Sequence, residues 1–333
     1  MADIAHDWTF HGGRLDRARA AFPDAPRPWI DLSTGISPHA WDAARIGPVD
    51  WRALPEPSAL AALEASAASL YGVEPDRVCA LPGSDLGLKL IEALDLPSPR
   101  YHVAPGYRGH ADALSASRPI GHENLGARAA GGGTVIFANP GNPEGRLFMP
   151  AELLPMVAAA RSSGGWMIVD EAFADMQPEA SLLRHIDRDA PVVVLRSFGK
   201  FFGLAGLRLG FAIAPTSQIA KLRARLGDWP LSTAAIAIGT AALSDRVWMA
   251  ETRQRIRASA RALDELLLGH GLKPTGSCPL FRLVDTDAAV LFERLARRGI
   301  LTRPFDYAPR WLRFGLPPDD EALDRLNRAL ADD

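Results

Sequence analysis

The residues best suited to chemistry are a lysine and an arginine in a glycine-rich segment, residues 197–210, which reads SFGKFFGLAGLRLG. The segment follows an apolar run, Val192–Leu195, that is typical of a buried strand in a parallel sheet. An apolar setting disfavours an ammonium ion and so favours the neutral amine of Lys200. A neutral amine is the nucleophile that forms an imine with an aldehyde. The alternative is a glycine-rich connection whose lysine merely reaches solvent.

A carboxylate ends a second buried run upstream, where Asp170 follows Trp166–Val169. Ligands of open α/β sheets bind outside the carboxyl ends of the strands, so we expect Asp170 and Lys200 to face the same crevice. An acid there can protonate and hold a pyridine nitrogen while the lysine holds an aldehyde of the same ring. The alternative role for Asp170 is a helix N-cap after a strand.

With Asp170-Glu171-Ala172, the 197–210 segment resembles the pyridoxal-phosphate enzymes of the aspartate-aminotransferase fold. Within them it is similar to the branch that holds histidinol-phosphate aminotransferase and the threonine-phosphate decarboxylase of cobalamin biosynthesis. Matching blocks run from about His11 to Arg313. The resemblance implies an α/β fold with a large cofactor-binding domain, residues 38–215, around a mostly parallel central sheet. Residues 1–37 and 216–333 would form a smaller α+β domain.

The resemblance also implies how pyridoxal 5'-phosphate would be bound. Lys200 would bind the aldehyde and Asp170 the ring nitrogen, both as catalytic residues. Tyr107 would stack on the ring, and Asn142, in a turn stiffened by prolines, would hydrogen-bond the ring hydroxyl. The phosphate would be held by Gly83, Ser84, Ser197 and Arg208. Gly83 and Ser84 precede an expected helix, whose free N–H groups favour an anion, although Ser84 alone would be an ordinary N-cap.

Five further residues are predicted to bind the substrate. His11 and Gly12 match an element that the decarboxylase branch uses for the substrate phosphate; from composition alone they form a flexible turn. Gly35 would let a carboxylate approach the backbone. Arg313 matches the arginine that clamps the α-carboxylate in a bidentate pair. Arg310 is expected to help hold a second anion, with a plain surface arginine as the alternative.

Two departures from the aminotransferase pattern favour the decarboxylase branch. Leu54 and Phe173 stand where aminotransferase relatives have tyrosines, which contact a partner subunit's cofactor phosphate and the ring oxygen. The predicted reaction is decarboxylation of L-threonine O-3-phosphate to (R)-1-amino-2-propanol O-2-phosphate for cobalamin biosynthesis. The alternative is a histidinol-phosphate aminotransferase, or another aminotransferase, that uses the same residues. A non-catalytic effector-binding protein is less favoured because Lys200, Asp170 and Arg208 are intact. His110 is expected at the surface.

Composition narrows the remaining classes of function. The 333 residues are 47% hydrophobic and 23% charged, with a formal net charge of -2, which is typical of a globular protein and argues against nucleic acid as a partner. Cys79 and Cys278 lie in apolar contexts and are predicted to be core residues, and no metal site is expected. No signal peptide or membrane span is apparent, so we expect a cytoplasmic protein. The resemblance implies a homodimer. Helices are expected over Ser217–Leu226 and Ser232–Gly269.

Overall fold

The computed structural model describes residues 8, 9 and 11–331, which fall into two compact units. The larger unit comprises Ala40–Asn142 and Leu147–Ala250, and the smaller one the chain up to His39, Pro143–Arg146 and the chain from Glu251 onward. This division differs from the boundary expected after residue 215, because residues 216–250 belong to the larger unit. Helix α9 (Thr216–Leu226) packs on strand β2 and helix α10 (Thr233–Ser244) on helix α3, and sequence periodicity does not report such packing partners.

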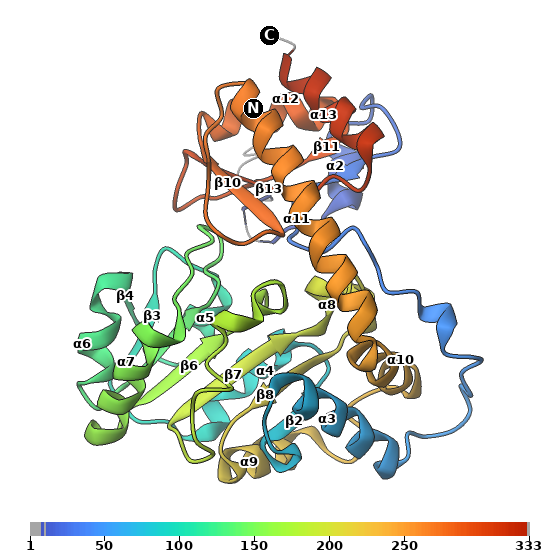
Figure 1. Ribbon diagram of the computed structural model, residues 1–333. Helices are drawn as coiled ribbons and strands as arrows, with labels where there is room; N and C mark the ends of the chain where they lie inside the picture. The colour runs from blue at the N-terminus through green and yellow to red at the C-terminus, as the bar shows by residue number, and fades with distance from the viewer. Residues whose placement is uncertain (1–7, 10, 332–333) are drawn as a thin grey trace. The chain divides into compact units, whose positions relative to one another are not determined.

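Seven strands in the described part of the larger unit form a sheet of order β2-β8-β7-β6-β5-β3-β4 (Figure 1). Strands β4, β3, β5, β6 and β7 run parallel to one another, whereas β8 runs antiparallel to β7 and β2. The mostly parallel central sheet that the family resemblance implies is therefore confirmed. Its strands are β2 (Val78–Leu81), β3 (Arg100–Val103), β4 (Arg118–Ile120), β5 (Thr134–Ala138), β6 (Trp166–Asp170), β7 (Val192–Ser197) and β8 (Gly210–Ile213).

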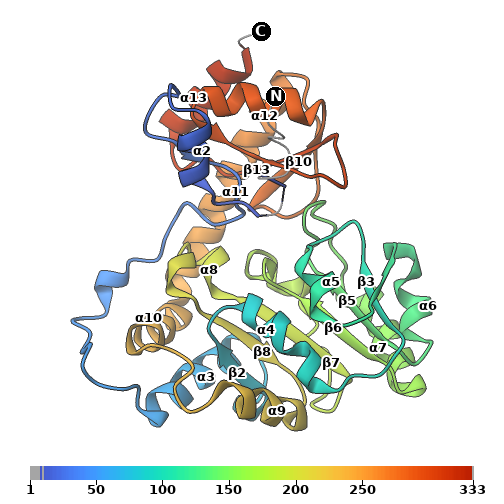
Figure 2. The same cartoon turned by 180° about the vertical axis from the view of Figure 1, so that it is seen from behind.

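Helices cover both faces of this sheet. Seen from behind, α4 lies over β7 and β8 (Figure 2), α9 packs on β2 within the same buried cluster, and Tyr71 of α3 packs edge-on against Phe211 on the opposite face. Helix α3 begins with a proline in its first turn and ends at Gly72, whose φ of 74° is left-handed, as the propensities of proline and glycine predict. Besides α9 and α10, the helices of this unit are α3 (Pro57–Tyr71), α4 (Ser84–Leu90), α5 (Gly109–Ala113), α6 (Leu125–Ala129), α7 (Pro150–Ser163) and α8 (Phe198–Phe201).

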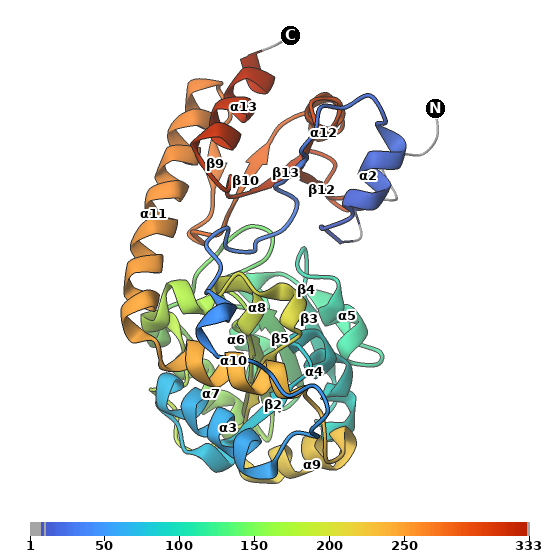
Figure 3. The same ribbon diagram turned by 90° about the vertical axis from the view of Figure 1, so that its right-hand side faces the viewer.

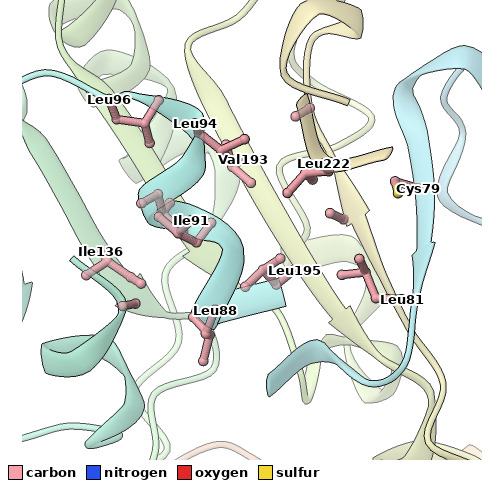
Figure 4. Packing of buried hydrophobic residues seen from close by; sticks show 14 of the residues in the cluster. Cys79, Leu81, Leu88, Ile91, Leu94, Leu96, Ile136, Val193, Leu195 and Leu222 are labelled. Atoms are coloured by element: carbon pink, nitrogen blue, oxygen red, sulfur yellow. The ribbon is translucent and has the colours of Figure 1, made fainter. Parts of the chain in front are cut away.

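The core under α4 fixes where that helix begins. Leu88 and Ile91 pack with Val193 and Leu195 of β7 and with Leu222 of α9, all of them buried (Figure 4). A Cβ on Gly87 would lie 2.7 Å from Leu81 Cδ1, so the glycine lets α4 approach the sheet closely. Burial of this apolar surface stabilises the position of the α4 N-terminus beside the ends of the strands.

The smaller unit is an α+β layer (Figure 3). In the described residues a four-stranded antiparallel sheet has the order β12-β13-β10-β9, and β1 pairs in parallel with β11. Cys278 is buried here and Cys79 is buried in β2, both as free thiols, which confirms their predicted core positions. The elements are α2 (Leu15–Ala21), β1 (Ile30–Asp31), β9 (Pro274–Thr275), β10 (Phe281–Asp285), α12 (Ala288–Arg297), β11 (Ile300–Leu301), β12 (Arg303–Pro304), β13 (Trp311–Gly315) and α13 (Asp320–Ala331).

The long helix expected over Ser232–Gly269 is two helices. α10 ends at Ser244 and α11 (Arg246–Gly269) begins after Asp245. Asp245 Oδ1 accepts a hydrogen bond from the backbone N–H of Trp248 at 3.0 Å, which is the geometry of an N-cap. The apolar periodicity continues across Asp245, and for that reason the sequence did not reveal the break.

Candidate active site

Asp170 and Ser197 end adjacent strands and face the same side of the sheet. Alternation along a strand places Asp170 with Ile168, and Ser197 with Leu195, on the face that α4 covers. Asp170 is buried, and its Oδ1 accepts a hydrogen bond from the N–H of Ala172 at 3.1 Å. It shapes the turn after β6 and does not cap a helix, while Oδ2 remains for other partners.

One of those partners is a histidine that we expected at the surface. His110 is 1% exposed, and its Nε2 lies 3.0 Å from Asp170 Oδ2. The prediction of a surface histidine is therefore wrong. A signal was present, because His110 follows Tyr107 by one helical turn and packs against its ring edge-on with 5.5 Å between centroids.

Tyr107 lies in the turn after β3, and its neighbours hold its ring. Its hydroxyl donates to Asp85 Oδ1 at 3.2 Å, at the beginning of α4. A Cβ on Gly109 would lie 2.5 Å from Tyr107 Cε1, so this glycine makes room for the ring. An aromatic ring is thus fixed next to the His110–Asp170 pair.

Lys200 lies in α8, a single helical turn directly after β7. A Cβ on Gly199 would lie 2.7 Å from Ala205 Cα, so the glycine allows the chain to fold back over this turn. Phe198 and Phe201 are buried, whereas Lys200 is half-buried. The Lys200 Nζ lies 5.7 Å from the ring centroid of Phe173 in the turn after β6. The amine therefore faces the turn that follows Asp170.

Four predicted phosphate ligands come together around the start of α4. A Cβ on Gly83 would lie 2.8 Å from Arg208 Nη2, and a Cβ on Gly210 would lie 2.5 Å from Ser84 N. Gly210 pairs with Ser197 across β8 and β7. Gly83 adopts φ 90°, and Arg208 adopts φ 54°, which is uncommon for a residue with a side chain.

This arrangement is a cradle for an anion. It combines backbone N–H groups at a helix N-terminus, two hydroxyl side chains and an exposed guanidinium held by its bond from Nη1 to Ala205 O at 3.1 Å. The two glycines leave the space that a Cβ would otherwise fill. The residues present therefore fit the phosphate group of pyridoxal 5'-phosphate, the cofactor that the family resemblance implies.

Asn142 lies in a turn that a different asparagine holds. The buried side chain of Asn139 accepts a hydrogen bond from Phe148 N at 2.8 Å and donates to Phe148 O at 2.9 Å. It also donates to Ala180 O at 3.3 Å. Asn142 is half-buried three residues further on. The sequence singled out Asn142 but not the structural role of Asn139.

A buried ionic network lies on the opposite face of the same strand ends. Arg196 Nη1 donates to Glu171 Oε2 at 2.8 Å, and its Nη2 pairs with Asp175. Ser181 Oγ donates to Glu171 Oε2 at 2.6 Å. Burial lowers the pKa of Arg196, but Asp175 and its other anionic neighbours outweigh burial and raise the pKa overall. Such a network fixes geometry more than it adds stability, and here it fixes the neighbours of Asp170 and Ser197.

In the smaller unit, the N-terminal glycines and Arg313 meet at Ser33. A Cβ on Gly12 would lie 2.3 Å from Ser33 O, and Gly13 N donates to Ser33 Oγ at 2.7 Å. Arg313 Nη2 donates to the same Ser33 O at 2.9 Å. His11 precedes these glycines and is half-buried, and Gly35 is buried two residues after Ser33. Four of the five predicted substrate residues thus lie on or next to one turn.

The structure does not bring Arg310 to this group and brings Arg303 instead. The Arg310 side chain is 69% exposed, and its Nε donates to Asp285 Oδ1 at 2.6 Å. Arg303 is buried and pairs directly with Arg313 across β12 and β13, so both side chains leave the same face. Burial, and then Arg303, lower the pKa of Arg313 to about 9. Two buried guanidinium groups side by side favour binding of an anion, because an anion offsets their desolvation and repulsion.

Two features are absent from the part of the chain that the structure describes. None of the helices there combines the length and apolarity needed to cross a membrane. Nor do the described side chains include a group of three or more His, Cys, Asp or Glu residues arranged to hold a metal ion.

Comparison with known proteins places the chain among its relatives. The family described as aminotransferase class I and II matches residues 123–330. The threonine-phosphate decarboxylase of Pseudomonas aeruginosa is 41% identical over 325 residues, which cover 96% of this chain and 96% of that protein. The threonine-phosphate decarboxylase of a Sinorhizobium species is 40% identical over 328 residues, covering 96% and 97%.

A solved structure shows the same fold. Histidinol-phosphate aminotransferase from Sinorhizobium meliloti, in complex with pyridoxal-5'-phosphate, superposes with a TM-score of 0.80 at 21% identity, covering 96% of this chain and 94% of that one. Its architecture agrees with the mostly parallel sheet described above. The family match over residues 123–330, together with the two relatives at 41% and 40% identity, shows that the chain belongs to the aminotransferase class I and II family.

Proposed function

We propose that this protein is a pyridoxal-phosphate enzyme that decarboxylates L-threonine O-3-phosphate to (R)-1-amino-2-propanol O-2-phosphate, a linker precursor in cobalamin biosynthesis. The observation that carries the proposal is the similarity over 96% of the chain to two proteins named threonine-phosphate decarboxylase. The buried pair of arginines supports it, because the substrate carries two anionic groups, a carboxylate and a phosphate.

The larger unit would hold the cofactor. Gly83, Ser84, Ser197 and Arg208 would bind its phosphate, Tyr107 would stack on its ring and Asn142 would hydrogen-bond its ring hydroxyl. Lys200 would bind its aldehyde. When bound, pyridoxal phosphate acts as an electron sink that stabilises a carbanion at the substrate Cα.

Asp170 would keep a proton on the ring nitrogen. Its carboxylate is buried, and His110 Nε2, at 3.0 Å from Oδ2, holds it in place. The ring nitrogen would be a further partner of this carboxylate. A buried carboxylate beside the ring nitrogen favours the protonated, positively charged form of that nitrogen. Lys200, whose Nζ lies 5.7 Å from the ring of Phe173 in the turn after β6, would carry a proton to the substrate Cα once carbon dioxide has left.

The smaller unit would select and orient the substrate. Arg313 would bind the α-carboxylate, and Arg303, His11 and the backbone near Gly12 the phosphate; the exposed ion pair of Arg310 with Asp285 argues for a lesser role of Arg310. Gly35 would let the carboxylate approach the backbone. Two fixed anionic ends determine which bond at Cα stands perpendicular to the ring, and that bond is the one that breaks.

Product analysis tests the proposal directly. Purified protein supplied with pyridoxal phosphate and threonine phosphate should release carbon dioxide and aminopropanol phosphate without any keto acid. The competing candidate, favoured by the aminotransferase family match, is a histidinol-phosphate aminotransferase. If turnover requires 2-oxoglutarate and yields glutamate, the aminotransferase is correct and the decarboxylase is not.

We also propose that the protein acts as a homodimer in the cytoplasm. The exposed apolar side chains of the larger unit include Trp51 at 78%, Leu54 at 62% and Trp229 at 58%. Trp229 lines a hollow with Pro57 and Leu60 on α3, and Thr233 Oγ1 donates to Ala53 O at 3.2 Å beside Leu54. Light scattering should give twice the chain mass, and Trp229→Glu should give the single mass.

A further inference from the structure

The helical turn that carries Lys200 is held by two tryptophans from distant parts of the larger unit. Trp248 stacks on Phe202 with 5.6 Å between centroids and 9° between planes, and Phe202 stacks on Phe198 at 4.3 Å. The backbone N–H of Trp41 donates to Phe202 O at 2.9 Å, at the end of α8. Both tryptophans are buried.

Asp245 connects the two tryptophans. Its Oδ1 accepts from the backbone N–H of Trp248 at 3.0 Å, and its Oδ2 accepts from Trp41 Nε1 at 3.2 Å. Arg45 Nη1 donates to the same Oδ2 at 2.6 Å and its guanidinium lies 5.8 Å from the Trp41 ring centroid. Asp245 lies between α10 and α11 and its carboxylate caps α11, so it acts on the C-terminal end of α8 only through the two tryptophans, from outside the predicted site.

We propose that Asp245 is a positioning residue for Lys200, acting through Trp41 and Trp248, which together fix the turn that carries the amine. α8 has a single turn, so its own hydrogen bonds hold it weakly. Its orientation therefore depends on the packing of Phe201 and Phe202 against Trp248, and on the bond from Trp41 N to Phe202 O. This inference rests on the proposed function, because the fixed amine matters only if it binds an aldehyde.

The variants Asp245→Asn and Trp41→Phe test the connection separately. Asparagine is as good an N-cap as aspartate, so Asp245→Asn keeps an oxygen for Trp248 N but replaces the acceptor of Trp41 Nε1 with a donor. Trp41→Phe removes the Nε1 donor and keeps a ring. The matched control is Asp287→Asn in the smaller unit, where Asp287 Oδ1 caps α12 through Val290 N at 3.3 Å.

Comparing the affinities of two cofactor analogues distinguishes a displaced lysine from a general loss of structure in the binding site. Pyridoxal phosphate can bond to the amine, whereas pyridoxine 5'-phosphate carries an alcohol in place of the aldehyde and cannot. Dissociation constants of both are measured on the full chain after removal of cofactor. In Asp245→Asn and in Trp41→Phe the dissociation constant of pyridoxal phosphate, divided by that of pyridoxine 5'-phosphate, should rise about tenfold. The double variant should show about the same rise, because both changes act through one connection. Asp287→Asn should leave the ratio within about twofold of the wild type.

Hydrogen exchange gives a second readout that does not need the cofactor. The amides of residues 198–202 and of Trp41 should exchange faster in the two site variants and not in Asp287→Asn. Suppose that the wild-type protein binds both compounds. If the variants then leave the ratio unchanged, or weaken binding of both compounds equally, the positioning role is overturned and the proposed function is not. If the wild-type chain binds neither compound, the proposed function fails and this inference fails with it. If Asp245→Asn does not fold, Trp41→Phe decides.

Discussion

At the scale of single residues, the two arginines near β13 give the sharpest difference between sequence and structure. Arg310 and Arg313 both stand out in the sequence, but Arg310 is exposed and Arg303 is the buried neighbour of Arg313. Pairing of β12 with β13 creates this neighbourhood, and pairing between strands ten residues apart is not visible in local periodicity. The sequence does carry one signal, because Arg303 is the single charged residue of the short run 300–304, which ends at Pro304.

We therefore predict that Arg303→Gln raises the KM for threonine phosphate by about 30-fold, because a lost hydrogen bond to a charged group costs about 2 kcal/mol. Arg310→Gln should change KM by no more than about twofold, since an exposed ion pair contributes little. Steady-state kinetics of the two variants, with their melting temperatures as a control for folding, decide the matter. The reverse order would restore Arg310 as the second anion ligand.

His110 is the second residue that structure adds to the site. We expect His110→Phe to weaken binding of pyridoxal phosphate by about tenfold, because Asp170 loses the partner that holds its Oδ2. The control is His102→Gln on the neighbouring strand β3, where the imidazole Nδ1 lies 2.8 Å from Ser117 Oγ. Spectrophotometric titration with cofactor measures both. Equal affinities in the two variants would show that His110 supports only the core.

At the scale of elements, the sequence predicted strands and turns well and helix limits less well. The strand ends carrying Asp170 and Ser197 follow from unbroken apolar runs, and the turns at Gly83 and Asn142 follow from glycine and proline. The break at Asp245 was missed because its capping bond to Trp248 competes with a continuous apolar pattern. The buried place of His110 was missed because α5 is too short to show an apolar face, so that its spacing from Tyr107 was the one available signal.

Helix α4 carries the next prediction. Gly83→Ala should weaken binding of pyridoxal phosphate and of inorganic phosphate, because a Cβ would lie 2.8 Å from Arg208 Nη2 and the φ of 90° suits only glycine. Gly206→Ala is the matched control in the loop before Arg208, where an added Cβ would meet no atom within 4 Å. Competition between phosphate and cofactor reports the effect. Loss of affinity in Gly206→Ala alone would contradict it.

At the scale of the whole molecule, the proposed roles divide between the compact units. Residues proposed to bind the cofactor belong to the larger unit, and those proposed to bind the substrate's anionic groups belong to the smaller one. The two cysteines divide in the same way, with Cys79 in β2 and Cys278 before β10. Each thiol can therefore report on one unit.

Burial raises the pKa of both Cys79 and Cys278 to about 12, so neither should react with iodoacetamide at pH 8 in the folded protein. Under increasing urea each thiol should become reactive when its own unit opens. Pyridoxal phosphate should protect Cys79 to higher urea concentrations than Cys278, because a ligand stabilises the unit that binds it. Peptide mass spectrometry of the labelled chain measures both sites at once, and equal protection would argue against cofactor binding within the larger unit.

The pairing of Arg303 with Arg313 has a consequence for redesign of this enzyme. Both arginines belong to hydrogen-bonded strands, while the residues that join them, 305–310, form a turn at the surface end of β12 and β13. The ring of the buried Phe305 lies 5.2 Å from the Arg303 guanidinium and has to stay in place, whereas insertions after Tyr307 leave the pairing of Arg303 with Arg313 in register. The end of the turn next to β13 is accordingly a place where an engineer can change specificity while keeping the two arginines that we propose bind the anionic groups of the substrate.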